Sequence, residues 1–253
     1  MKEFRYFYAP ELAVSDELPA DEAAHCLRVL RLQVGDEIWV TDGKGRCCRA
    51  EIVADGGKRC RFRIVEEESL PREWTSHLHL AVAPTKNIDR MEWLAEKATE
   101  IGFDELTFLD CRYSERKVVK TERIDKILVA AMKQSHKAFK PVLNGMEDFR
   151  RFVARDFPGQ KFIAHCYDES DIEGRGVGAE EKTMDGGKPF LLDVLDATQD
   201  TLVMVGPEGD FSVEEVRLAL QHGFRPVSLG RSRLRTETAA LVSVHLMRIR
   251  HAR

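Results

Sequence analysis

The spacing of hydrophobic and polar positions changes near residue 72 of the chain. Before that point, short runs alternate between apolar and polar residues. A period of two is typical of strands with one buried face, so residues 1–72 are predicted to form a small β-rich unit. The pattern predicts strands over Phe4–Tyr8, Glu37–Gly43, Cys47–Val53 and Arg59–Val65, with a short helix within Asp21–Leu30.

Glu66–Arg72 combines a run of glutamates with Pro71, a composition typical of a linker. Beyond it, apolar runs alternate with segments whose apolar residues recur at helical spacing, which predicts a mostly parallel sheet covered by helices. Residues 167–188 are polar and glycine-rich, which is typical of a long surface loop. The expected strands are Leu78–Ala83, Glu105–Leu109, Lys161–His165, Leu202–Val205 and Val227–Leu229, and the expected helices are Ile88–Ile101, Ile124–Ser135 and two that begin near Val213 and Thr236.

The composition indicates a globular protein with a sizeable core. The chain has 253 residues, of which 43% are hydrophobic, enough for one large domain or two of ordinary size. Its six cysteines form no CxxC pair and no Cys/His zinc spacing, so we expect reduced thiols and no metal. The first residues lack the apolar core of a signal peptide, and no apolar run reaches membrane-spanning length, so we expect a cytoplasmic protein.

The net charge of the chain is -4, but three of its segments are rich in basic residues: 44–63, 112–140 and 225–253. Local potential governs the binding of a polyanion, so an acidic protein with such segments can still bind RNA. In the first segment, alternation places several arginines on one face of the predicted sheet. Such a face suits a phosphate backbone, or its arginines only solvate the outer side of the sheet, and the pattern leaves both readings open. These arginines are Arg49, Arg59, Arg61 and Arg63.

Two glycine-bearing turns carry the clearest functional signal. Gly206–Ser212 and Leu229–Ala239 each follow a predicted strand and lead into a predicted helix, and Ser212 with Glu215 forms a capping box. Turns at the carboxyl ends of neighbouring parallel strands build ligand sites, although a tight strand–helix connection would have the same sequence. The chain contains no P-loop, no GxGxxG motif and no GxSxG elbow. The turns therefore predict a site that does not depend on a phosphate cradle.

The two turns, Val205–Gly209 and Leu229–Ala239, resemble those of the S-adenosylmethionine-dependent 16S ribosomal-RNA uracil-N3 methyltransferase family, a branch of the SPOUT superfamily. The resemblance covers nearly the whole chain. Asp210 departs from it, standing where the family has a second glycine, and residues 167–188 are longer than is typical. His136-Lys137 depart too, because an arginine usually follows Gln134-Ser135. Further matching motifs are His25–Arg31 with Gly35-Asp36, Lys86 with Asp89–Glu92, Lys97–Gly102 and Gln134-Ser135.

The resemblance implies a PUA-like RNA-binding β-barrel over residues 1–72 and an α/β methyltransferase domain over residues 73–253. In this family the α/β domain threads a trefoil knot that holds S-adenosyl-L-methionine (SAM), and the protein is a homodimer with its active site near the subunit interface. The implied cofactor-binding residues are His165, Val205, Gly206, Pro207, Glu208, Gly209, Leu229, Gly230, Leu234, Arg235 and Thr236.

The implied reaction is methyl transfer from SAM to N3 of a uridine in 16S rRNA, free or in the 30S subunit. Uracil N3 is weakly acidic, so a cation near the flanking carbonyls would help, and Arg235 is the candidate. Glu237 either accepts the proton or favours the helix N-terminus, and Glu208 either faces the donor or shapes its loop. A non-catalytic RNA-binding assembly factor and a SPOUT methyltransferase for a different RNA remain alternatives. The candidate RNA contacts are Arg28, Arg31, Arg49, Arg61, Lys86, Arg90, Arg112 and Arg116.

Overall fold

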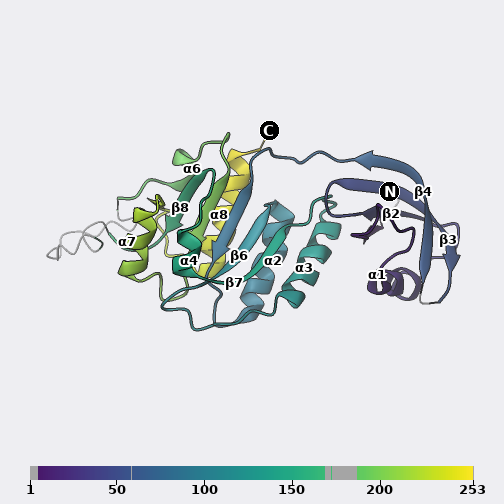
Figure 1. The fold of residues 1–253 in the computed structure, drawn as a ribbon, viewed down its shortest axis with the longest axis horizontal. Coiled ribbons are helices and arrows are strands. Elements are labelled where there is room, and N and C mark those ends of the chain that lie inside the picture. Colours follow the sequence, from purple (N-terminus) through teal and green to yellow (C-terminus); the bar gives the residue numbers. More distant parts are fainter. Residues whose placement is uncertain (1–4, 58, 169–171, 173–186, 253) are drawn as a thin grey trace. The chain divides into compact units, whose positions relative to one another are not determined.

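The computed structural model describes residues 5–57, 59–168, 172 and 187–252 (Figure 1). The chain forms two compact units. The first unit comprises residues 1–72 together with 128–140, and the second comprises residues 73–127 and 141–253. Residues 128–140, which the sequence places in the α/β domain, therefore pack with the first unit. Among the described residues, no helix combines the length and the apolar character needed to cross a bilayer.

The first unit is built on a four-stranded sheet in the order β1-β2-β3-β4. β1 runs parallel to β2, whereas β2, β3 and β4 are antiparallel neighbours. The short helix α1 (Ala20–Ala24) continues into a π-helical turn, η1 (His25–Val29). The strands are β1 (Tyr6–Tyr8), β2 (Glu37–Thr41), β3 (Arg46–Asp55) and β4 (Cys60–Ser69), and they confirm the four predicted from alternation.

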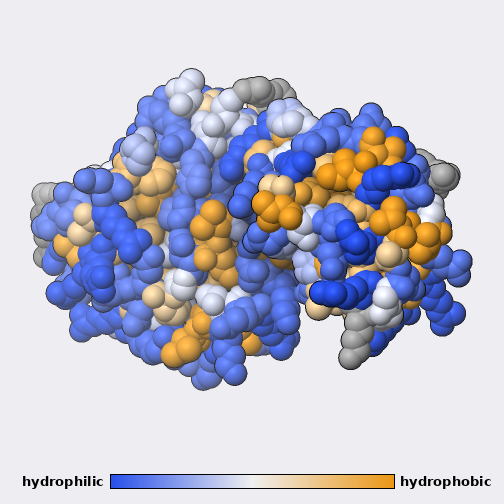
Figure 2. All heavy atoms as spheres, turned by 45° about the vertical axis from the view of Figure 1, so that its right-hand side comes forward, coloured by the Kyte–Doolittle hydropathy of each residue, from blue (hydrophilic) through white to orange (hydrophobic). Residues whose placement is uncertain are grey.

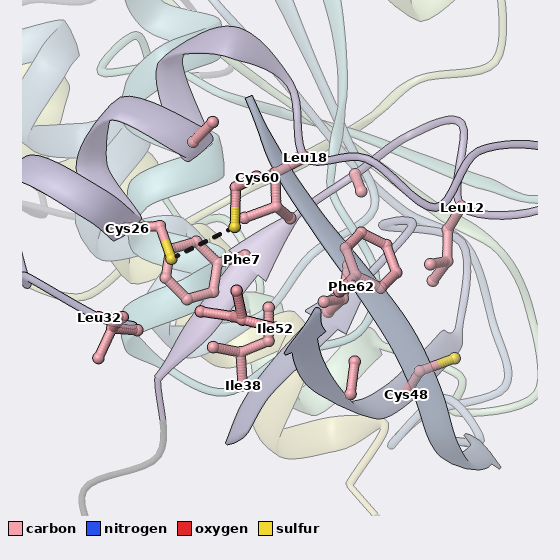
Figure 3. Close-up of a cluster of buried hydrophobic side chains, with 14 residues drawn as sticks. Phe7, Leu12, Leu18, Cys26, Leu32, Ile38, Cys48, Ile52, Cys60 and Phe62 are labelled. Atoms are coloured by element: carbon pink, nitrogen blue, oxygen red, sulfur yellow. Dashed lines mark hydrogen bonds between the residues drawn. The ribbon is translucent and has the colours of Figure 1, made fainter. Parts of the chain in front are cut away.

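Inward-facing side chains of this sheet form the core of the first unit. Ile38, Ile52 and Phe62 come from three different strands and pack around Phe7 (Figure 3). The thiols of Cys26 and Cys60 lie 3.9 Å apart in the same core. Alternation was a reliable guide here because one face of each strand is buried while the other faces water.

The predicted linker is wrong for Glu66–Ser69, which belong to β4. The Arg49 side chain lies 3.1 Å from the Glu66 carboxylate, and Arg46 lies 2.6 Å from that of Glu67. Arg49 and Glu66 stand directly opposite each other on antiparallel strands, where opposite charges stabilise a sheet, so the glutamate run extends β4 instead of ending it.

The second unit contains a six-stranded sheet in the order β10-β8-β9-β5-β6-β7, and all of its pairs are parallel. The strands are β5 (Leu78–Val82), β6 (Glu105–Asp110), β7 (Val142–Asp148), β8 (Gln160–Ala164), β9 (Thr201–Val205) and β10 (Arg225–Val227). The helices are α2 (Ile88–Ile101), α3 (Thr121–Gln134, whose second half counts with the first unit), α4 (Phe149–Val153), α6 (Leu191–Val194), α7 (Val213–Gln221) and α8 (Thr236–Arg250). Of these, β7, α4 and α6 were not predicted.

Helices cover both faces of this sheet (Figure 1). Phe149 of α4 and Val216 of α7 pack with Ile163 and Met204 of the central strands on one face. On the other face α8 packs against α2, β5 and β9. α2 has the predicted bounds and ends at Gly102, whose φ of 112° suits a residue without a side chain. Because every strand is parallel, the loops that follow the strands share one edge of the sheet.

Candidate functional site

The loop after β9 is a tight turn that requires glycine at its first position. The Asp210 N–H donates to the Pro207 carbonyl at 2.9 Å. A Cβ on Gly206 would lie only 3.0 Å from the Phe211 backbone nitrogen, closer than side chains normally approach backbone. The predicted capping box is present, since Ser212 and Glu215 each bind the other's backbone N–H and α7 begins at Val213. This loop therefore holds a defined backbone conformation.

Asp210, which the resemblance predicts to stand at a glycine position, has a backbone conformation that glycine favours. Its φ is 65°, in the left-handed region that glycine occupies freely and aspartate tolerates. Its carboxylate accepts the Phe211 N–H at 2.7 Å and the Cys166 N–H at 2.8 Å. Burial raises the pKa of this carboxyl, and its hydrogen bonds from backbone N–H groups oppose that effect. Asp210 thus keeps the loop conformation that a glycine would allow, and its carboxylate binds the loop to the end of β8.

Two aromatic residues that the sequence did not single out support the same loop. The Tyr167 hydroxyl donates to the Phe211 carbonyl at 2.8 Å. A Cβ on Gly209 would lie 3.1 Å from the Cβ of Tyr113, so the loop packs closely on that side chain. No sequence signal marks either residue, because each acts on a loop far away in the chain.

Glu208 shapes the site by binding the turn after β5. Its carboxylate accepts the Lys86 N–H at 2.9 Å. Arg116, a predicted phosphate contact, donates to the carbonyls of Thr85 at 3.1 Å and Lys86 at 2.6 Å. The turns after β5 and β9 are therefore held to each other.

His165 lies at the end of β8 with neither ring nitrogen hydrogen-bonded to any described residue. Only 7% of the residue is exposed. Burial, assisted by the charge of Lys188, lowers its pKa to about 3. The imidazole is therefore neutral at physiological pH and offers one donor and one acceptor to a neighbouring group.

The loop after β10 is more open. The Ser228 hydroxyl accepts the Gly230 N–H at 3.1 Å, and Gly230 has a φ of 118° with no atom within 4 Å of a Cβ built on it. Burial and the Asp210 carboxylate raise the pKa of the Cys166 thiol, and the positive charge of Arg233 opposes that effect. Arg235 precedes α8, and its exposed guanidinium has no polar partner within the described part of the chain.

Glu237 is buried in the first turn of α8. Its Oε1 lies 3.6 Å from the guanidinium of Arg90 on α2, whereas its Oε2 has no partner among the described residues. Only 8% of Glu237 is exposed. The predicted phosphate contact Arg90 thus contacts a carboxylate of the site, and Glu237 keeps one oxygen available for a ligand.

The remaining predicted cofactor residues lie at the same edge. Val205, Pro207 and Thr236 are buried, and Leu229 and Leu234 are half-buried. Arg112 follows β6, donates its N–H to Glu215 at 2.7 Å and pairs with Glu214 at 3.1 Å. A cleft of about 620 Å³ adjoins Arg112, and it is lined by Arg112, Lys117, Arg150, Glu214 and Arg217, but by none of the described residues predicted to bind the cofactor.

The predicted RNA contacts of the first unit differ from one another in their partners. Arg28 and Arg31 are exposed. Arg49 lies 2.6 Å from Glu37 and 3.1 Å from Glu66, and Arg61 pairs with Asp16. Both Arg49 and Arg61 would have to exchange a carboxylate for a phosphate in order to bind RNA.

The family of the chain follows from comparison with known proteins. Residues 72–248 match an RNA methyltransferase domain, and residues 18–65 match an RNA methyltransferase PUA domain. The chain belongs to the RNA methyltransferase family. This match and the parallel sheet confirm the predicted fold class, an α/β domain preceded by a PUA-like unit.

Relatives of known structure have the same fold along almost the whole chain. A probable rRNA-methyltransferase from Porphyromonas gingivalis is 41% identical, with a TM-score of 0.86 over 98% of this chain and 99% of that one. A protein from Legionella pneumophila, solved with bound cofactor SAM, is 27% identical, with a TM-score of 0.81 over 98% of each chain. Comparison of sequences alone finds a further relative, Ribosomal RNA small subunit methyltransferase E of Synechocystis, which is 28% identical over 250 residues, 95% of this chain and 76% of that protein.

Proposed function

We propose that this protein transfers a methyl group from SAM to N3 of a uridine in 16S ribosomal RNA. One observation carries the proposal: His165 and Glu237 are buried at the loop edge of the sheet with polar atoms that no described residue satisfies. Buried polar atoms nearly always have hydrogen-bond partners, so these mark the place where a ligand completes the structure. The relatives named as small-subunit rRNA methyltransferases support rRNA as the substrate, and the relative solved with SAM supports SAM as the methyl donor.

The loops after β8, β9 and β10 fit the donor. SAM, when bound, supplies an electrophilic methyl group on a sulfonium cation. The residues that would hold it are His165, Val205–Gly209, Leu229, Gly230 and Leu234–Thr236. Because burial keeps His165 neutral, it can hydrogen-bond a donor molecule without repelling its positive charge. Glu208, which is committed to the Lys86 N–H, shapes the loop.

Arg235 and Glu237 would act on the uracil. The N3 proton must leave before the nitrogen can react, and the negative charge then spreads onto the two flanking carbonyls. The guanidinium of Arg235, which pairs with no described residue, is available to stabilise that charge. Oε2 of Glu237, likewise without a partner in the described ranges, is available to accept the proton while Arg90 holds Oε1.

N3 lies on the Watson–Crick edge, so the target uridine must be unpaired when it reacts. This requirement explains why an RNA-binding PUA-like unit accompanies the methyltransferase domain. Lys86 and Arg112 would bind phosphates near the target, and to do so each would leave an exposed carboxylate partner, Glu115 or Glu214.

We further propose a cytoplasmic homodimer whose α/β domain contains the trefoil knot that its family resemblance implies. The exposed side chains of Trp93 on α2 and Ile249 on α8 are candidates for the dimer contact, because large apolar groups at the surface favour association. Sedimentation of the purified chain would detect the dimer.

The proposal is tested by incubating the chain with methyl-labelled SAM and 30S subunits that lack the modification. We expect label in 16S rRNA, recovered as N3-methyluridine after digestion, and SAM binding measurable by calorimetry. Glu237→Gln should bind SAM but transfer slowly, with a loss of about 10²–10⁴ in rate, whereas Glu100→Gln on the α2 surface should behave as wild type. SAM binding without transfer to any RNA would instead indicate a non-catalytic assembly factor.

A further inference from the structure

The cleft of about 620 Å³ in the second unit opens between the carboxyl ends of β6 and β7 and the helix α7, and we call it the α7 cleft. Clefts of roughly 300–1,000 Å³ that combine apolar walls with a few polar groups are the usual binding sites for small molecules and their parts. On the face drawn in Figure 2, hydrophobic side chains form only separate patches among hydrophilic ones. The residues that line the α7 cleft include Asp110, Asp148, Phe149, Arg217, Leu218 and Gln221.

The acidic groups on one side of the α7 cleft already have partners within the chain. Asp110 lies 2.6 Å from Lys117, and Glu214 lies 3.1 Å from Arg112. Glu215 accepts the Arg112 N–H at 2.7 Å and belongs to the capping box of α7. Cations and backbone N–H groups thus satisfy these carboxylates, so they shape the cleft without requiring a ligand.

Two cations of the α7 cleft lack a carboxylate. Arg150 on α4 is exposed and has no ion-pair or hydrogen-bond partner among the described residues. Arg217 on α7 donates from Nε to the Ile172 carbonyl at 2.6 Å and forms no ion pair within the described part of the chain. A guanidinium group can hold a phosphate through two parallel hydrogen bonds. Arg150 and Arg217 therefore favour a ligand that carries a phosphate.

The apolar part of the α7 cleft suits a nucleobase. It consists of Cys111 and Phe149, which are buried, and Leu218, which is half-buried. An unpaired base exposes two apolar faces that such side chains can cover. A flat apolar ring joined to a phosphate is a nucleotide, so the apolar and cationic parts of the cleft together match one nucleotide.

Asp148 gives the α7 cleft a means of distinguishing bases. One of its carboxylate oxygens accepts the Arg151 N–H at 3.0 Å and caps α4, while the other has no partner in the described ranges. A carboxylate oxygen accepts a hydrogen bond from the amino group of a base such as cytosine. Uracil has a carbonyl oxygen at that position, which a carboxylate repels. The cleft therefore favours a base with an exocyclic amino group.

Arg112 and Tyr113 connect the α7 cleft with the proposed transfer site. Arg112 lines the cleft, and its guanidinium carbon lies 5.7 Å from the centre of the Tyr113 ring. Tyr113 is 47% exposed and packs closely on Gly209 of the loop after β9. Unpaired bases stack on exposed aromatic rings. A strand whose target uridine lies at the transfer site can therefore pass Tyr113 and reach the cleft, which favours a nucleotide of the substrate over a free one.

We propose that the α7 cleft binds one nucleotide of the substrate RNA close to the target uridine. The base lies against Phe149 and Leu218 and donates an amino N–H to Asp148, and its phosphate lies on Arg150 and Arg217. The proposal rests on the proposed function in taking RNA as the substrate. It adds a site in the α/β domain that selects the sequence around the target.

The first test compares two labelled RNAs by fluorescence anisotropy with the full chain: a short oligouridine, and the same strand with one central cytidine. Wild type should bind the strand with cytidine about tenfold more tightly. Asp148→Asn should remove or reverse this preference, because the asparagine amide donates a hydrogen bond where the carboxylate accepts one. Asparagine caps a helix as well as aspartate does, so α4 should be retained.

Asp193→Asn is the matched control, because Asp193 is exposed on α6, does not line the cleft and undergoes the same change of charge. It should keep the wild-type preference for cytidine. Equal Kd values of the wild type for the two strands, or a preference that survives in Asp148→Asn, would overturn the proposal. Binding of cytidine monophosphate alone as tightly as the strand with cytidine would show a site for free nucleotides and would also overturn it.

A second test concerns the phosphate. Arg150→Gln/Arg217→Gln should lower the slope of log K against log salt by about 0.7, the value for one phosphate contact on a single strand. Arg151→Gln removes a neighbouring exposed cation that does not line the cleft, and it should leave the slope unchanged. A wild-type slope in the double variant would contradict the assignment of the phosphate.

Methyl transfer to 30S subunits is measured in parallel, which separates this inference from the proposed function. In Asp148→Asn, KM for the subunits should rise while kcat is retained, because the residue contacts the substrate away from the reacting atoms. A preference for cytidine that depends on Asp148 in a chain that transfers no methyl group would leave the inference standing and remove the proposed function. Normal transfer with equal Kd values for the two strands would do the reverse.

Discussion

The carboxylate of Asp210 accepts the backbone N–H of Cys166 at 2.8 Å and so joins the loop after β9 to the end of β8. The same carboxylate caps the Phe211 N–H, and its residue adopts a left-handed φ of 65°. Asp210 thus supplies both a backbone conformation typical of glycine and a hydrogen bond that glycine cannot make.

Substitution of Asp210 should separate these two contributions. Asp210→Gly keeps the left-handed backbone and loses the hydrogen bonds, whereas Asp210→Ala loses the bonds and adds strain. We expect the alanine variant to be less stable than the glycine variant by about 1 kcal/mol, measured by urea denaturation. Equal stability of the two variants would show that the backbone there is unstrained.

Gly206 should be indispensable to donor binding for a steric reason. A Cβ there would lie 3.0 Å from the Phe211 nitrogen and 3.1 Å from its ring, so Gly206→Ala must displace the loop. We expect the SAM Kd measured by calorimetry to rise by at least about tenfold, the equivalent of 1.4 kcal/mol. Gly145→Ala in β7 is the control, because nothing lies within 4 Å of that Cβ and its affinity should be unchanged.

Arg235→Ala should abolish methyl transfer while SAM binding largely survives. Removing a group that stabilises developing negative charge typically lowers kcat by about 10²–10³. The comparison is Arg231→Ala, an exposed arginine of the same loop with no assigned role, which should turn over normally. Full turnover by Arg235→Ala would remove the residue from the mechanism.

The buried imidazole of His79 should make the second unit sensitive to acid. Burial lowers its pKa to about 4 against the opposing effect of Glu105, while the unfolded chain titrates near 6.5. Between these values the unfolded state binds a proton that the folded state does not, so stability falls as the pH falls from 6.5 towards 4. The slope is up to about 1.4 kcal/mol per pH unit.

Denaturation curves measured across this pH window should be flatter for His79→Gln than for wild type. His165, whose pKa is lowered to about 3, contributes with the same sign and remains in the variant. An unaltered slope in His79→Gln would mean that the residue takes up its proton without unfolding.

The elements predicted correctly are those whose signal is local. Leu78–Val82 and Thr201–Val205 are fully buried strands and appear as short runs in which all residues but one are apolar. α7 was located by a capping box that lies within four residues of sequence. By contrast, β7 is an edge strand with partly exposed side chains and Gly145 in its middle, so it shows neither alternation nor an apolar run.

Features that depend on a distant partner were not predictable. The glutamates at 66–67 resembled a solvated linker because their arginine partners lie about twenty residues away. Arg90 and Arg116 stay predicted phosphate contacts, but the sequence did not reveal their protein partners, Glu237 and the Thr85 carbonyl. The resemblance named the loops of the site, but the unsatisfied atoms of His165 and Glu237 are visible only after folding.

The central claim is tested most directly by mass mapping of 16S rRNA from cells that lack the gene, with and without the restored protein. We expect one uridine to lose a single methyl group in the deletion strain, located to N3 by nucleoside analysis. The wild-type chain should restore it, and Arg235→Ala should not. An unchanged methylation map in the deletion strain would contradict the account.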